Sequence, residues 1–195
     1  ELKQSPVQKM KAVKTDAELE HYKEAFKKTD LAVSAVRDFI ENNDNISEYD
    51  IAQKLEEYFI KFGAKSLSFK SIVAKDKNSA LAHYSKCSKD EILHDGSIVL
   101  IDCGAYYDGG LATDITRVFV KGNPSDLHKK IYTIVLKTFL HSFNFKNPKN
   151  GYEIDNLARE IFEKNPVEGF VFNHGLGHGI GVSVHEYPPN LSKNE

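Results

Sequence analysis

The sequence predicts an α+β fold in which a pair of helices is followed by strands twice along the chain. Apolar residues recur at helical spacing in two stretches within residues 16–63 and in two more within residues 125–164. β-prone runs follow each pair, and the strongest, residues 98–120, contains a hairpin turn signal. With 195 residues, 41% of them hydrophobic and 28% charged, the chain is long enough for one sizeable domain or a tight pair.

Charge and cysteine content argue against several classes of partner. The formal net charge is −2 and no long Lys or Arg block occurs, so we expect neither nucleic-acid nor membrane binding. The longest apolar runs are far shorter than a membrane span. Cys87 and Cys103 lack metal-type spacing, and no secretory segment opens the sequence, so we expect free thiols and a cytoplasmic location.

The N-terminal part is predicted to be a linker followed by one long helix. Residues 1–14 are polar, contain Pro6 and have no sustained period, which predicts a linker or an extended segment. Thr15 and Glu18 match a capping box, and the apolar spacing after them predicts a helix over residues 16–42.

A second helix is predicted between Ser47 and Gly63. Ser47 and Asp50 match another capping box, and Gly63 is a typical helix-terminating residue. Its apolar residues share one face, which we interpret as facing the core: Ile51, Leu55, Phe59 and Phe62.

Alternating apolar residues then predict a half-buried strand over residues 67–73. Residues 76–79 are predicted to form a loop that delivers Ala82-His83-Tyr84 to a short β-prone segment. A lone histidine is more often a surface or core residue than a functional one, so this pattern alone does not single out His83. Residues 86–96 are predicted to form a polar loop.

The most informative stretch is the hairpin predicted within residues 98–120, with its turn at Asp108-Gly109-Gly110. This turn places Asp102 and Asp114 opposite each other. Like charges that face each other across a β-ladder are destabilising, and a cation bound between them would make the arrangement favourable. The alternative is that one aspartate caps a turn and the other is solvated.

The second half of the chain repeats the helical pattern. Ser125 is predicted to cap a helix whose buried side carries Ile131, Val135 and Phe139. A second amphipathic helix is predicted over residues 152–164, with Ile154, Leu157 and Ile161 facing inward and Pro166 ending it. Residues 167–172 are a strand candidate.

A glycine-rich segment with three histidines, residues 173–186, follows. His174, His178 and His185 lie among four glycines, which disfavour a helix, so we expect an irregular loop that enters a strand near Val182. Imidazole is a common metal ligand and proton carrier. A regular strand would put His178 and His185 on opposite faces, so either a bulge intervenes or they do different jobs. The alternative is a glycine-rich loop with incidental histidines.

Four motifs together resemble the pita-bread metallopeptidases, which comprise aminopeptidase P, prolidase and methionine aminopeptidase. The motifs are Asn78-Ser-Ala-Leu-Ala-His83-Tyr84, Asp102-Cys-Gly with Thr113-Asp-Ile-Thr-Arg, His174-Gly-Leu-Gly-His178-Gly-Ile-Gly, and Val184-His-Glu. They occur in the family's order, and the resemblance as a whole runs from about residue 5 to the last residues of the chain. The Xaa-Pro aminopeptidase branch matches best.

This resemblance implies a pita-bread catalytic domain with a dinuclear site, usually of two Mn²⁺ ions, held by two Asp, one His and two Glu. Carried over by position, Asp102, Asp114 and His178 would be metal ligands, with Asp114 bridging. His83, His174 and His185 would orient the substrate and stabilise its tetrahedral intermediate. Carboxylates with one imidazole suit Mn²⁺ better than thiolates do.

The sequence also departs from the family pattern. The two aspartates are one residue farther apart than usual, which a bulge could absorb. The family's glutamate ligands come from later strands, and Glu186 is not assigned as one. We therefore expect residues 15–195 to be a pita-bread domain truncated at its C-terminal side, joined by the 1–14 linker to a missing N-terminal domain. Alone, this chain is expected to bind metal weakly, to be nearly inactive, and to self-associate or be unstable through an exposed sheet edge.

Several functions compete. An Xaa-Pro aminopeptidase would cut peptides of various lengths with proline second, whereas a prolidase would require a dipeptide; methionine aminopeptidase matches less well. Non-catalytic pita-bread domains that bind proteins or nucleic acids, and creatinase-type metal-free members, also exist. Because Asp102, Asp114 and His178 are present and no basic face is evident, we interpret the chain as an enzyme. Whether the protein forms a homodimer is left undecided by the sequence.

Overall fold

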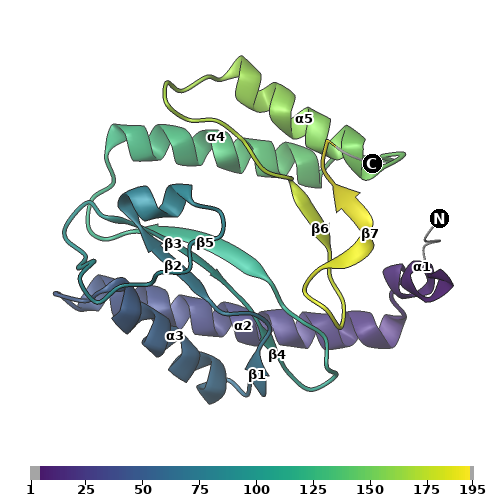
Figure 1. The fold of residues 1–195 in the computed structure, drawn as a ribbon, viewed down its shortest axis with the longest axis horizontal. Helices are drawn as coiled ribbons and strands as arrows, with labels where there is room; N and C mark the ends of the chain where they lie inside the picture. The colour runs from purple at the N-terminus through teal and green to yellow at the C-terminus, as the bar shows by residue number, and fades with distance from the viewer. Residues whose placement is uncertain (1–4, 194–195) are drawn as a thin grey trace. The chain divides into compact units, whose positions relative to one another are not determined.

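The computed structural model describes residues 5–193 and divides them into two compact units. The larger unit consists of Val13–Asn123 and Ile180–Val184. The smaller unit consists of the described residues up to Ala12, Pro124–Gly179, and the described residues from His185 onward. Helices and strands occur in both units (Figure 1), so the α+β class is confirmed.

The two helices of the larger unit follow the sequence prediction closely. Helix α2 spans Asp16–Asn42 and helix α3 spans Glu48–Lys61, and both begin with the predicted capping boxes. The face of α3 that was predicted to be apolar is buried, with Phe59 fully inaccessible. Gly63 follows α3 with φ of +90°, a conformation that glycine adopts without strain.

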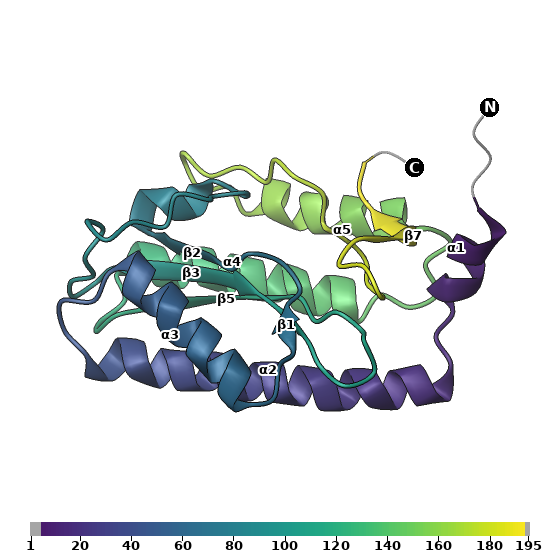
Figure 2. The same ribbon diagram turned by 60° about the horizontal axis from the view of Figure 1, so that its bottom comes forward.

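An antiparallel sheet of β2 (Ile72–Lys75), β3 (Ile98–Cys103) and β5 (Ile115–Val120) packs against these helices. Figure 2 shows α2 and α3 on one face of the sheet. The side chains of Val99, Ile101 and Cys103 in β3 are buried in the same cluster as residues of α2 and α3. The alternate residues of β3, which include Asp102, belong to the opposite face and are partly exposed.

The single strand predicted over residues 67–73 is wrong, because the segment contributes to two separate ladders. Strand β1 (Ser66–Leu67) pairs with β4 (Ala105–Tyr106), whereas β2 pairs with β3. The registers of the two ladders differ by two residues, so the residues between β1 and β2 leave the pairing.

The segment that carries His83 also differs from its prediction. Asp76–Ala80 forms the 3₁₀-helix η1 rather than a loop, and Ala82-His83-Tyr84 forms no strand. Its backbone makes consecutive turns instead, since Leu81 N donates to Asn78 O and Tyr84 N donates to Leu81 O, each at 3.1 Å. Residues 86–96 follow largely as the predicted polar loop.

The smaller unit contains two helices that lie side by side, α4 (Asp126–Phe143) and α5 (Gly151–Lys164) (Figure 1). Ser125 caps α4 as predicted, but the predicted buried side of α4 is wrong. Val135 and Phe139 are 47% and 59% exposed, whereas Ile134 and Thr138 are buried. The reason is that apolar residues lie on several faces of α4, so their spacing does not specify which face packs against α5. The residues of α5 that were predicted to face inward are half-buried, as expected: Ile154, Leu157 and Ile161.

Both strands that the sequence predicted for this region are placed wrongly. Residues 167–172 make only a bridge between Val167 and Phe170 around a turn at Gly169, where φ is +82°. The strand expected near Val182 occurs earlier, as β6 (Gly177–Gly179), which pairs with β7 (Glu186–Leu191). Around Val182 the chain bonds to the central hairpin of the larger unit instead, through Tyr106 Oη to Val182 O at 2.8 Å.

The segment predicted as a linker contains a helix, α1 (Pro6–Ala12). This helix lies beside β7 (Figure 1), and Lys11 Nζ contacts Glu186 Oε1 at 2.6 Å. Residues 6–12 are therefore not extended. Residues 1–4 of the predicted linker lie outside the described residues, and the function of this segment as a linker stays a prediction.

Candidate active site

The central hairpin brings Asp102 and Asp114 onto the same face of the sheet, although not in the predicted register. Asp102 pairs with Thr116, and the same register continues to a bridge between Tyr106 and Ala112, so Asp114 stands opposite Gly104. Direct opposition of the two aspartates is therefore wrong by two residues. The cause is the turn, whose centre lies one residue later than expected.

Same-face residues in this diagonal relation lie about 7–8 Å apart, within reach of one bridging group. Thr116 Oγ1 donates to Asp102 Oδ1 at 2.8 Å. Burial raises the pKa of the Cys103 thiol, and the charges of Asp102 and Asp114 raise it further. Both carboxylates therefore lie near this position of β3, where the charge of Arg117 acts on the thiol in the opposite direction.

Close backbone packing fixes the position of Asp114. A Cβ at Gly104 would lie 1.8 Å from the carbonyl oxygen of Thr113, so only glycine permits this approach. Thr113 is fully buried, and its hydroxyl bonds to Ala105 N at 3.0 Å and to Thr29 Oγ1 at 2.8 Å. These contacts hold the residue directly before Asp114.

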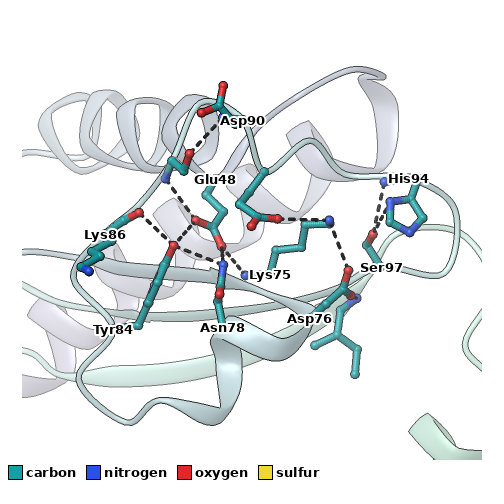
Figure 3. Close-up of polar contacts among 12 residues, drawn as sticks. Glu48, Lys75, Asp76, Asn78, Tyr84, Lys86, Asp90, His94 and Ser97 are labelled. Carbon is teal, nitrogen blue, oxygen red and sulfur yellow. Dashed lines mark hydrogen bonds and ion pairs between the residues drawn. The ribbon is translucent and has the colours of Figure 1, made fainter.

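His83 lies in the larger unit and is exposed. Residues on either side of it, Asn78 and Tyr84, both bond to the buried carboxylate of Glu48 (Figure 3). Glu48 could not be singled out from its sequence context, because a glutamate just after a helix N-cap is normally solvent-exposed.

The other three candidate histidines, His174, His178 and His185, belong to the smaller unit. His174 Nδ1 lies 2.7 Å from Gly175 O, and His178 Nδ1 lies 2.9 Å from Gly179 O. A carbonyl can only accept, so each Nδ1 carries the proton and the ring lone pair is on Nε2. A histidine that binds a metal commonly donates its other N–H in this way.

An irregularity in the β6–β7 ladder brings His178 and His185 together. The register shifts by three residues between His178 and Gly179, and the two rings meet with centroids 4.1 Å apart at 72°. The two histidines do not share one strand, as both alternatives assumed: His178 lies in β6, and His185 directly precedes β7. The two rings therefore lie in contact, and a shared role stays a prediction.

A buried ion pair anchors the segment that leads to His178. Asp155 has no exposed side-chain surface, and Arg159 Nε donates to it at 2.7 Å. Arg159 also donates to the carbonyls of Phe172 and His174 at 2.9 and 2.7 Å, and Leu176 N donates to Asp155. This ion pair was not predicted from the sequence. The i, i+4 spacing on α5 was a signal, but the same spacing is typical of solvent-exposed pairs.

The donor chemistry of the sequence-predicted ligands fits a hard divalent ion. Two carboxylates and an imidazole with its lone pair on Nε2 are the groups that Mn²⁺ accepts. Asp102 and Asp114 belong to the larger unit, whereas His178 belongs to the smaller one. Across residues 5–193, no three His, Cys, Asp or Glu side chains are grouped closely enough to hold a metal. Cys87 and Cys103 are free thiols, as predicted.

Fold and motifs together match the pita-bread class of proteins. Residues 20–195 match the model of metallopeptidase family M24, and the chain belongs to that family. It is 37% identical to a probable Xaa-Pro aminopeptidase P of Aspergillus niger, over 96% of this chain and 32% of that protein. It is 35% identical to an Xaa-Pro dipeptidase of Pyrococcus horikoshii, over 93% of this chain and 50% of that protein.

Solved structures confirm the fold. An X-Pro aminopeptidase from Thermotoga maritima superimposes with a TM-score of 0.87 at 34% identity, covering 96% of this chain and 52% of that one. The chain spans from about a third to half the length of the curated relatives it matches. Among the described residues, no helix has the length and apolar character needed to cross a membrane.

Proposed function

We propose that the protein is a metal-dependent exopeptidase that hydrolyses the bond between an N-terminal residue and a following proline. The proposal rests on membership of metallopeptidase family M24 and on similarity to proteins named Xaa-Pro aminopeptidase and Xaa-Pro dipeptidase. The observation that carries it is the hairpin of β3 and β5. This hairpin places the carboxylates of Asp102 and Asp114 on one face of the sheet, next to a close backbone contact that only glycine at position 104 permits.

In this proposal Asp102, Asp114 and His178 hold two divalent ions, taken to be Mn²⁺. The two aspartates neutralise the positive charge, and the bond from Thr116 orients Asp102. The Gly179 carbonyl keeps the proton on Nδ1 of His178, so Nε2 is the nitrogen that presents a lone pair. The ions, when bound, would activate water and polarise the scissile carbonyl.

The other candidate histidines act on the substrate in this proposal. His83 and His185 orient the peptide and donate hydrogen bonds to the oxyanion that develops at the scissile carbonyl. His174, whose Nδ1–H is donated to the Gly175 carbonyl, orients the peptide through Nε2, which accepts a hydrogen bond when the ring is neutral and donates one to the oxyanion only as the imidazolium. His174 is held by Arg159 through its main-chain carbonyl and by an edge contact with the Phe172 ring. His185 is held against His178. Preorganised donors of this kind stabilise a transition state because they need no reorientation during the reaction.

Prolidase is the alternative within the same chemistry, and a relative named Xaa-Pro dipeptidase, 35% identical, favours it equally. The two differ in tolerance of length, since a prolidase cuts dipeptides only. A non-catalytic binding module is the alternative from another class. The retained aspartates and histidines favour an enzyme over this alternative.

The test uses full-length protein stripped of metal and then supplied with Mn²⁺. Cleavage of an Arg-Pro-Pro tripeptide supports the aminopeptidase, and cleavage of Xaa-Pro dipeptides alone supports the prolidase. Asp114→Asn is expected to abolish either activity, whereas Asp108→Asn removes the same charge from the exposed turn and should leave it intact. No Mn²⁺-dependent cleavage of either substrate would refute the proposal and favour the binding module. We further propose a cytoplasmic location and leave open a homodimer.

A further inference from the structure

Glu48 is a buried charge that the proposed chemistry does not use. It is the first residue of α3, and its exposed fraction is zero. Four donors bond to its carboxylate (Figure 3). Oε1 accepts from Lys75 N at 2.7 Å and from Asn78 Nδ2 at 3.0 Å. Oε2 accepts from Tyr84 Oη at 2.8 Å and from Ser88 N at 3.1 Å.

These bonds use the full acceptor capacity of an ionised carboxylate, which has about four lone-pair sites. The four donors are uncharged, so hydrogen bonds and the N-terminal end of α3 stabilise the negative charge. An amide could not replace it, because its NH₂ group would face a backbone N–H that has no lone pair. The site therefore selects a carboxylate by geometry rather than by an ion pair.

The donors come from both sides of His83. Lys75 and Asn78 precede it, at the end of β2 and in η1, and Tyr84 and Ser88 follow it. Glu48 thereby closes a loop whose two ends meet on a single side chain. Burial and the bond to Glu48 raise the pKa of Tyr84 to about 12, so its hydroxyl remains a donor at neutral pH.

Little else holds this loop to the folded body. Leu81 is 59% exposed, and His83 is exposed as well. Apart from Glu48, the bonds between this loop and the folded body are Tyr49 N to Ser88 O at 3.2 Å and Lys70 Nζ to Ser85 O at 3.4 Å. Within the loop, the two turns are joined by a contact of Tyr84 Oη with Lys86 O at 2.8 Å, so Lys86 O shares the single Tyr84 proton with Glu48. Removal of the Glu48 carboxylate would take hydrogen bonds from both flanks of His83 at once and leave the second flank with the bond from Tyr49 N to Ser88 O and the longer one from Lys70 Nζ to Ser85 O.

We propose that Glu48 is a positioning residue that fixes His83 for the reaction by tying both flanks of its loop to α3. This inference depends on the proposed function, because it gives His83 a catalytic role. Glu48 itself touches no reacting group in this proposal. Its effect on the rate passes entirely through the placement of His83.

The test compares Glu48→Gln with His83→Ala and with the double variant in full-length protein. Displacement of a catalytic group by about 1 Å costs up to about 100-fold in rate, so we expect Glu48→Gln to lower kcat by about 10- to 100-fold, with less change in KM. In the His83→Ala background the same substitution should have almost no further effect. Glu57→Gln, on the exposed side of the same helix, is the matched control and should behave as the wild type.

A second variant and a second measurement cover the case in which Glu48→Gln misfolds. Tyr84→Phe removes one bond only and should lower kcat less, again without effect in the His83→Ala background. Amide hydrogen exchange should be faster in residues 78–88 of Tyr84→Phe, with the protection of α2 unchanged. The positioning role would be overturned if the loss of kcat in Glu48→Gln or Tyr84→Phe added to that of His83→Ala. It would also be overturned if both kcat and amide hydrogen exchange were unchanged in Tyr84→Phe. A wild-type protein that cuts no Xaa-Pro peptide would instead overturn the proposed function.

Discussion

The substitution Asp155→Ala is expected to lower the free energy of unfolding strongly, because it breaks the buried ion pair that holds the segment leading to His178. The substitution leaves the guanidinium of Arg159, whose side chain is only 13% exposed, without its carboxylate. Loss of one partner of a buried ion pair costs about 3–5 kcal/mol. The amide of Leu176 also loses its acceptor, which adds about 1 kcal/mol where the bond is not replaced by water. Since these losses overlap, we expect a total of about 4 kcal/mol, a large part of a typical stability of roughly 5–15 kcal/mol.

Urea unfolding followed by far-UV circular dichroism measures this cost, because the chain contains no tryptophan. With an m-value of about 2 kcal/mol/M, the midpoint should fall by about 2 M. Glu160→Ala is the matched control on the same helix. Its pair with Lys164, at 3.6 Å, joins side chains that are 48% and 74% exposed, so about 0.5 kcal/mol or less is expected.

A double variant separates the unpaired charge from the lost bonds. Asp155→Ala combined with Arg159→Met removes both charges and should be more stable than Asp155→Ala alone, because no uncompensated charge is then buried. A cost for Asp155→Ala no larger than that for Glu160→Ala, or a double variant less stable than Asp155→Ala, would refute a stabilising buried ion pair.

Three further predictions concern the larger unit. Gly104→Ala should lower Tm by roughly 5–10 °C in a thermal melt, since the new Cβ meets the Thr113 carbonyl at 1.8 Å and the backbones must separate; an unchanged Tm contradicts the close approach. Burial and the nearby Glu48 raise the pKa of Cys87 to about 11, so its alkylation at pH 8 should be at least about tenfold slower than that of free cysteine and should accelerate toward pH 11. A reaction as fast as that of free cysteine would show an exposed thiolate. The Ser47 hydroxyl and amide hold the pKa of Asp50 below its usual range, so its contribution to stability is present above about pH 4 and is lost as pH falls through the lowered value. Asp50→Asn should therefore be less stable than the wild type at pH 7 in urea titrations, and a gap that persists at pH 2 would contradict this cause.

Helix boundaries in the larger unit could be predicted because their signals are local. Thr15 and Ser47 each bond to an amide three residues later, so a short stretch of sequence contains the whole interaction. The apolar face of α3 was equally clear, because one stripe such as Ile51, Leu55 and Phe59 leaves a single side to bury.

Register and burial of polar groups could not be predicted because they depend on distant partners. Asp102 and Asp114 were placed on the same hairpin correctly, but one residue in the turn decided that Asp102 faces Thr116. Glu48 and Asp155 were missed, since their bonding partners lie up to 40 and 21 residues away. Their sequence contexts resemble those of ordinary exposed carboxylates.

Mn²⁺ binding by the full-length protein tests the central claim most directly, namely that Asp102, Asp114 and His178 hold the same metal centre. We predict that Asp102→Asn, Asp114→Asn and His178→Ala each weaken binding in calorimetric titration of metal-free protein by at least about tenfold. Asp108→Asn, with the same charge change in the same hairpin, should bind as the wild type. Wild-type affinity in all three ligand variants would contradict the claim.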